Sequence, residues 1–208
     1  MAFDTKYAFV GFCVGFTRSP RNDFGTFAQG YHRAAHLLSQ ALLAKPRFPD
    51  YEAYPVAYLY RHAFELNLKN VIYKAALLSA FRRMDDFDAK LYNQHKLQPL
   101  ASRAREILIA LFPEDQGLTS IADDLRVVAQ EMSTIDDSSY VYRYPIARDG
   151  RCSVDRPQTV NLVGLSTRMD QILNQPEVID FGIDVETHVA QEVFEIIERL
   201  TTEDHHGQ

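Results

Sequence analysis

Four ionisable side chains lie close together in a segment that otherwise has the pattern of a buried helix. Arg61, His62, Glu65 and Lys69 belong to the largely apolar stretch 54–81. At 100° per residue, Arg61, Glu65 and Lys69 fall within about 80° of one another, with His62 beside them. Apolar residues flank this stripe on both sides. If the stripe is buried it must be paired, because an unpaired buried charge costs several kcal/mol.

The stripe has two interpretations. In the first, Arg61 and Lys69 bind a phosphate or a carboxylate, and Glu65 orients Arg61. His62 then serves as a general acid or base. In the second, the stripe is structural, because Arg61–Glu65 and Glu65–Lys69 both have the i,i+4 spacing of helix-stabilising ion pairs.

Two residues farther along the chain are candidates for the same site. His95 stands where a loop meets a predicted helix, so it can reach a site made by neighbouring helices, or cap its helix, or lie on the surface. Arg143 follows the turn 136–139 and either lies over the mouth of a bundle or is a solvated arginine on a hairpin. An open cleft shared by His95 and the stripe would indicate chemistry. Closure of the stripe by Glu65 and a second carboxylate would indicate a structural role.

Metal and cofactor chemistry have little support in the sequence. His32 and His36 have a spacing that can hold a metal, but no carboxylate stands near them in the sequence. The chain contains no phosphate-binding glycine loop, no dinucleotide fingerprint, no serine nucleophile elbow and no zinc-type cysteine cluster. We therefore expect neither a metal nor a cofactor.

Composition and charge are those of a globular protein of 208 residues, with 46% hydrophobic and 24% charged residues and a net charge of −6. The charge is uneven. Residues 1–110 hold 15 Lys or Arg against 9 Asp or Glu, and residues 111–208 hold 7 against 19. The basic half can attract phosphates, or it can be neutralised by the acidic half within one chain or across a dimer.

Targeting signals are not evident. No run of about 18 apolar residues predicts a membrane span, and the apolar stretch 7–16 lacks the basic leader of a signal peptide. Cys13 and Cys152 have neither metal-like nor redox spacing. We expect a cytoplasmic protein with reduced thiols and no contact with a membrane.

Hydrophobic periodicity predicts an all-α bundle of about six helices with a small β-hairpin near 140–155. We divide the chain into an irregular segment 1–25, a single helical domain 26–201 and a disordered tail 202–208. The expected helices span about 26–44, 54–81, 119–132, 161–173 and 185–200, with a further helix that follows residues 95–99 and is stopped at 112–114.

Several short motifs occur in an order that resembles the HEPN-type helical domains, over roughly residues 30–175. They are YPVAYLYRHAFELNLK at 54–69, HKLQPL at 95–100, YRYP at 142–145 and VNL at 160–162. The resemblance is to bacterial proteins of unassigned function that carry a YRHALEL-LK helix, a histidine-led helix and an RYP hairpin.

This resemblance implies a helical bundle, often a homodimer. Many HEPN domains are metal-independent endoribonucleases of toxin–antitoxin and antiphage systems, and others bind nucleotides or serve a partner protein. For this chain the resemblance implies that such a partner would be encoded in the same operon. Their arginine-to-histidine spacing occurs only at Arg199 and His205 in the acidic tail. We set that pair aside because of its acidic surroundings. The resemblance suggests a protein that binds or cleaves RNA or nucleotide phosphates, and the stripe and the loop histidine supply His62, His95 and Arg61 as its candidate catalytic residues. Its substrate-binding residues would be Lys69, Arg143 and Glu65. The alternative is a non-catalytic interaction or scaffold module.

Overall fold

The chain folds into a helical bundle. The computed structural model describes residues 23–82, 94–136, 139, 141–144, 146, 150–153 and 159–205. These residues form five α-helices and one short 3-10 helix: α1 (Asp23–Leu43), η2 (Asp50–Glu52), α2 (Ala53–Phe81), α3 (Leu97–Leu111), α4 (Gln116–Ser133) and α5 (Leu162–His205). The predicted all-α architecture is confirmed.

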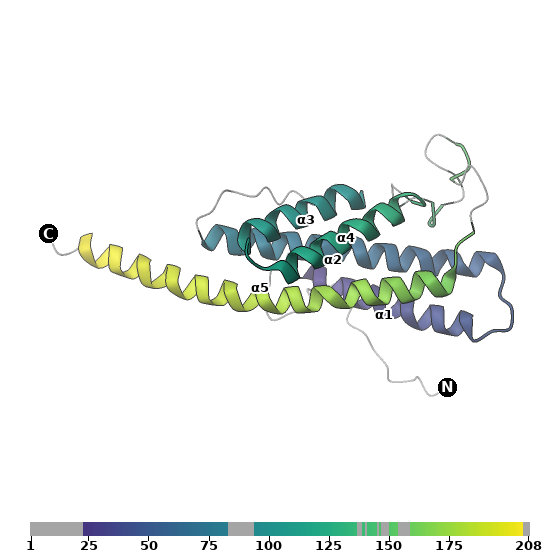
Figure 1. Ribbon diagram of the computed structural model, residues 1–208, viewed down its shortest axis with the longest axis horizontal. Helices are drawn as coiled ribbons and strands as arrows, with labels where there is room; N and C mark the ends of the chain where they lie inside the picture. The colour runs from purple at the N-terminus through teal and green to yellow at the C-terminus, as the bar shows by residue number, and fades with distance from the viewer. Residues whose placement is uncertain are drawn as a thin grey trace, which may run out of the picture.

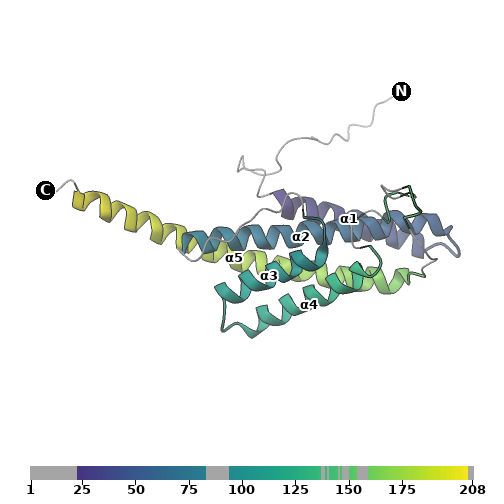
Figure 2. The same cartoon turned by 90° about the horizontal axis from the view of Figure 1, so that it is seen from above.

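Helix α2 is the centre of the bundle, and it packs against α1, α3 and α5 (Figures 1 and 2). Helix α5 runs parallel to α2, since Asn70 bonds to Asp180 and Lys74 bonds to Asp184, a constant separation of 110 residues. Helices α1 and α2 are joined by a short connection and lie antiparallel. Helix α4 returns along α3.

The central position of α2 follows from its sequence, because its apolar residues are not confined to one stripe. Residues on several of its faces are fully buried, and they form the core with the inner faces of the other helices. Those from α2 are Val56, Ala57, Tyr60, Ala63, Phe64, Leu68, Val71, Ile72, Ala75 and Leu78. Because neighbouring helices cover α2 on several sides, some of its polar side chains are buried as well.

Local capping sets where two of the helices begin. The Asp115 side chain accepts a hydrogen bond of 2.9 Å from the Leu118 backbone N–H. This cap starts α4 at Gln116, three residues before the predicted start. The Asn161 side chain accepts from the Gly164 N–H at 3.0 Å and starts α5 in the same way.

The prediction of two separate helices at 161–173 and 185–200 is wrong, because α5 is continuous from Leu162 to His205. Pro176 lies inside this helix, where a proline costs about 3 kcal/mol. The helix continues past it because Met169, Ile172, Ile179 and Ile183 all bury against the core. Tertiary burial outweighs the local penalty.

The β-hairpin expected near 140–155 is not seen among the residues that the structure describes there. They contain one isolated antiparallel bridge, between Ile146 and Cys152, and no strand. The other residues of that prediction, and the segment 1–22, lie outside the described residues. Helix α5 extends into the predicted tail as far as His205. None of the described helices has both the length and the apolarity that a membrane crossing requires.

Candidate functional site

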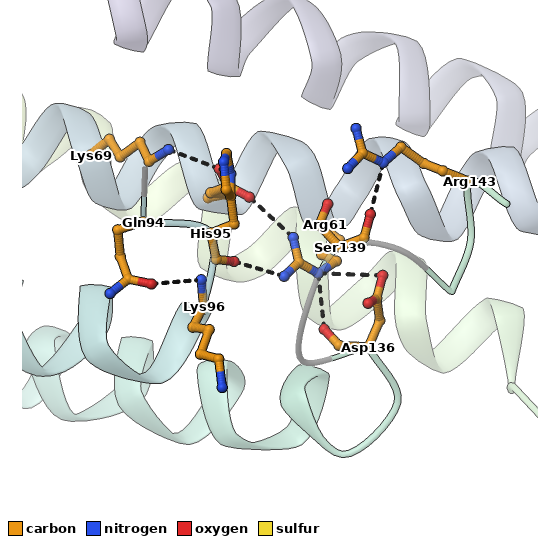
Figure 3. A network of polar contacts seen from close by, with 9 residues as sticks. Arg61, Lys69, Gln94, His95, Lys96, Asp136, Ser139 and Arg143 are labelled. Atoms are coloured by element: carbon orange, nitrogen blue, oxygen red, sulfur yellow. Dashed lines mark hydrogen bonds and ion pairs between the residues drawn. The ribbon is translucent and has the colours of Figure 1, made fainter. Parts of the chain in front are cut away.

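The predicted stripe of α2 is buried, and Arg61 is its centre. The Arg61 side chain has an exposed fraction of 0%, and each of its three nitrogens donates a hydrogen bond (Figure 3). Nε donates to the Asp136 carbonyl oxygen at 3.0 Å, Nη1 to Oε2 of Glu65 at 3.1 Å, and Nη2 to the His95 carbonyl oxygen at 2.9 Å. Arg61 thus ties α2 to the start of α3 and to the end of α4.

Glu65 is the buried acceptor on which the cluster converges. Its Oε1 lies 2.9 Å from Nζ of Lys69 and 2.9 Å from Nδ1 of His95. Burial alone would raise the pKa of Glu65, but hydrogen bonds from Lys69 and His95 outweigh it and hold the pKa below its ordinary value. Glu65 is therefore a carboxylate at neutral pH.

A second carboxylate closes the cluster. Oδ2 of Asp136 lies 3.6 Å from Nε of Arg61, and neither side chain is exposed to solvent. Arg61 and Lys69 are thus matched by Glu65 and Asp136, two positive charges by two negative ones. A buried group of charges is tolerated when its members are paired and hydrogen-bonded.

His95 is the member of the cluster that solvent reaches. Its side chain has an exposed fraction of 57%, while its partner Glu65 is almost wholly buried. Since an ionised carboxylate can only accept, Nδ1 of His95 carries the proton of their bond. Nε2 is then the nitrogen able to take or give a proton, an arrangement that suits a general base.

His62 lies on a different face of α2, toward α1. Its ring stacks on Tyr58 at 5.5 Å and meets Tyr31 edge-on at 4.5 Å. Burial lowers the pKa of His62, and the positive charge of Arg143 lowers it further. His62 is therefore biased toward the neutral imidazole.

Arg143 and His62 both contact the ring of Tyr58. Its guanidinium carbon lies 5.6 Å from the centre of the Tyr58 ring and 5.6 Å from that of Tyr144. Its Nε donates to the Ser139 carbonyl oxygen at 2.7 Å (Figure 3). Ser139 has a positive φ of 65°, which lies in the left-handed region.

The structure thus divides the six predicted site residues into two groups. Arg61, Glu65, Lys69 and His95 form one connected cluster. His62 and Arg143 are joined through Tyr58. Sequence reasoning missed Asp136 as a member of the cluster. The sequence did contain an indication of it. Two buried cations on one helix need a second carboxylate besides Glu65, and Asp136 is the first residue of the turn 136–139.

A second polar group, absent from the predicted site, joins α1, α2 and α5. Asp170 accepts from Nε2 of His32 at 2.9 Å, from Nδ1 of His36 at 2.8 Å and from the Tyr60 hydroxyl at 2.9 Å. Asp170 is the carboxylate that the sequence around the two histidines lacked. Burial raises the pKa of Tyr60 to about 12, so its hydroxyl remains a donor. Among the described residues, no set of three or more ligand-type side chains is arranged to hold a metal ion.

A hollow of about 410 Å³ lies beside the N-terminal end of α2. Its walls include Tyr54 and Ala57 of α2, with Tyr142 and Leu162 opposite. None of the six predicted site residues lines it. The hollow is nevertheless next to the buried cluster at Tyr142, because burial and then the charge of Asp136 raise the pKa of Tyr142 to about 12.

Comparisons of the chain with protein-family models, with curated proteins and with solved structures found no match.

Proposed function

We propose that this chain is a non-catalytic helical interaction module and that its buried ionic cluster is structural. The observation that carries the proposal is the closure of Arg61, whose three nitrogens all donate to protein acceptors while the side chain has no exposure. A guanidinium that binds phosphate must present donors to the ligand. Arg61 could do so only if its fully buried side chain became accessible to the ligand.

Lys69 supports the same conclusion. Its side chain is 5% exposed, and its ammonium bonds to Glu65. Both cations expected to bind phosphate are thus used inside the protein. Arg61 holds α2 against two segments that are distant in sequence, and Lys69 pairs with Glu65 on the same helix. What such a module binds is another protein, whether a second copy or a partner from the same operon.

The second candidate function is the binding or cleavage of RNA or nucleotide phosphates by a HEPN-like, metal-independent ribonuclease, in a toxin–antitoxin or antiphage setting. The Glu65–His95 pair favours it, because a buried carboxylate orients a solvent-accessible imidazole. His95 would deprotonate a ribose 2′-hydroxyl, and Arg143 with His62 would lie at the phosphate. In this candidate function Arg61 takes no part in the chemistry. It only positions His95, by donating a hydrogen bond to the His95 backbone carbonyl.

One experiment separates the two candidates. Wild type, His95→Ala and the exposed neighbour variant Gln98→Ala are expressed in cells, and total RNA is sequenced for new cleavage ends. Thermal unfolding of the purified proteins is measured in parallel. The interaction module predicts no new ends with the wild type. It also predicts a melting temperature for His95→Ala below those of the other two proteins, because buried Glu65 loses one of its hydrogen-bond donors.

New ends that are produced by the wild type and by Gln98→Ala, but not by a folded His95→Ala, would reject the interaction module in favour of the ribonuclease. Because the His95 side chain is more than half exposed, its replacement removes a hydrogen bond to Glu65 but opens no cavity in the core. The loss of cleavage would then be a chemical effect.

A further inference from the structure

The hollow of about 410 Å³ beside the start of α2 has the size of a small-molecule site, since ligand pockets in proteins measure about 300–1,000 Å³. Three separate parts of the chain meet around it. They are the connection between α1 and α2 with the first turns of α2, the segment 141–142, and the start of α5. Two of its wall residues, Ala57 and Leu162, are only 3% and 6% exposed. The hollow therefore reaches from the surface to buried apolar residues.

Three aromatic side chains line this hollow. They are Phe48 in the connection, Tyr54 in the first turn of α2, and Tyr142. The rings of Tyr54 and Tyr142 lie 6.2 Å apart between centroids, at an angle of 56°. The face of an aromatic ring carries partial negative charge, so several rings around one space attract a cation. The walls thus favour a ligand that is both apolar and positively charged.

The charge on the walls has the sign that such a ligand needs. Asp50 lines the hollow, and none of the other described residues that line it is Lys, Arg or His. Lys45 belongs to the same connection, but its ammonium lies 2.6 Å from Glu52 and is already paired. An anionic ligand would therefore meet Asp50 with no cation on the described walls to hold it, whereas a cationic ligand would gain a partner.

The buried cluster beside the hollow adds to this negative field at Tyr142. Burial has the largest effect in raising the pKa of Tyr142 to about 12, and the charge of Asp136 comes next. Arg61 lowers the same pKa but has a smaller effect than Asp136. At the Tyr142 hydroxyl the carboxylate thus outweighs the guanidinium.

We propose that the hollow binds a small organic cation, whose alkylated ammonium group is held by the rings of Tyr54 and Tyr142 and by the carboxylate of Asp50. The remainder of the ligand lies against apolar walls such as Ala57 and Leu162. An organic cation fits better than Mg²⁺ or Ca²⁺, because those ions require several oxygen ligands and these walls are mostly carbon. This inference goes beyond the proposed function, since it concerns a small ligand and no protein partner.

Choline and its uncharged analogue 3,3-dimethylbutan-1-ol test the need for a positive charge, because the two molecules have nearly the same shape. Each is titrated into the full chain at pH 7, and binding is followed through the amide resonances of the protein by NMR. We expect choline to shift resonances of the residues around the hollow, with a dissociation constant on the order of millimolar. The neutral analogue should bind at least about fivefold more weakly.

Tyr54→Leu tests the aromatic wall, since leucine keeps an apolar side chain but removes the ring. We expect the affinity for choline to fall at least about threefold, and Tyr54→Phe should retain it. Tyr51→Leu is the matched control, because Tyr51 is a neighbouring tyrosine that is 69% exposed and does not line the hollow. Tyr54 is itself 44% exposed, so its replacement opens no cavity in the core. Circular dichroism confirms that each variant is folded.

Asp50→Asn tests the charged wall at constant size. The affinity for choline should fall about threefold, while that for the neutral analogue should stay the same. Glu52→Gln is the matched control. Glu52 belongs to the same short helix, but it pairs with Lys45 and does not line the hollow.

If choline shifts no resonances, or if choline and its neutral analogue bind equally well, the proposal is overturned. Equal losses of affinity in Tyr51→Leu and Tyr54→Leu would overturn it too, because the cation would then lie elsewhere. These results are independent of the RNA assay. Choline binding accompanied by His95-dependent RNA cleavage would keep this inference and reject the proposed function, whereas the absence of both would do the reverse.

Discussion

Arg61 and Asp136 form an ion pair from which solvent is excluded, with 0% exposure on both side chains and 3.6 Å between Nε and Oδ2. The pair joins the N-terminal third of α2 to a residue three positions beyond the end of α4. The Asp136 backbone carbonyl accepts from the same Nε at 3.0 Å. This contact holds α4 at the level of the α2 cluster.

Removing the guanidinium should therefore be costly. Arg61→Ala leaves Asp136 and Glu65 as buried carboxylates without their cation, and we expect the free energy of unfolding to fall by about 3–5 kcal/mol. Urea unfolding followed by circular dichroism measures this change.

Arg126→Ala is the control for that measurement. Arg126 is 51% exposed and lies 4.0 Å from Asp123 in an i,i+3 pair. Its loss should change the free energy of unfolding by no more than about 0.5 kcal/mol. If Arg61→Ala costs as little as Arg126→Ala, the cluster does not hold the bundle together.

Acid should destabilise the fold through two carboxylates. Burial would raise the pKa of Glu65 and of Asp170, but their hydrogen-bonding partners hold both values below the ordinary ones. A group whose pKa is lower in the folded state contributes stability above its unfolded pKa, about 4 here, and loses that contribution as the pH falls through the folded value. The urea midpoint should thus fall below about pH 4. An earlier decline between pH 7 and 5 is expected from His62, because burial lowers its pKa below the unfolded value of about 6.5.

Asp170→Asn checks the origin of that acid loss. Its urea midpoint at pH 7 should be lower than that of the wild type, because the bonds from His32 and His36 lose their charged acceptor. Its further loss between pH 5 and 3 should be smaller, since one titrating carboxylate is gone. A midpoint that rises as the wild type is acidified would contradict the assignment of both groups.

Asp180 should behave in the opposite way. Burial raises the pKa of Asp180 despite the neighbouring Lys74. Oδ1 of Asp180 and Oδ1 of Asn70 are both buried without a hydrogen-bond partner among the described residues. An amide at position 180 would remove the charge and could donate to Asn70. We expect Asp180→Asn to raise the free energy of unfolding at pH 7 by about 1 kcal/mol.

Thermal unfolding at pH 7 measures this gain, with Asp184→Asn as the control. Asp184 pairs with the same Lys74 at 2.7 Å, but its side chain is 60% exposed. Its replacement should change little. A clear loss of stability in Asp180→Asn would show that the ion pair with Lys74 outweighs the burial of the carboxylate.

Local sequence patterns determined most of the helices. Prolines at positions 46, 49 and 55 bracket the connection between α1 and α2, and apolar spacing places α3 and α4 within a few residues of their ends. The patterns failed in α5, where they predicted two helices separated at about residues 174–184. Helix continuity there depends on burial against other helices, which a local pattern does not contain.

The sequence by itself also determined that Arg61, Glu65 and Lys69 share a face of one helix, because helical geometry relates positions three and four apart. Only the tertiary structure decided that Asp136 and the His95 carbonyl close this cluster, and that Asp170 of α5 lies between His32 and His36 of α1. Those partners come from segments 34 to 138 residues away. Their approach is set by how whole helices pack, since core packing rather than spacing along the chain brings distant polar groups into contact.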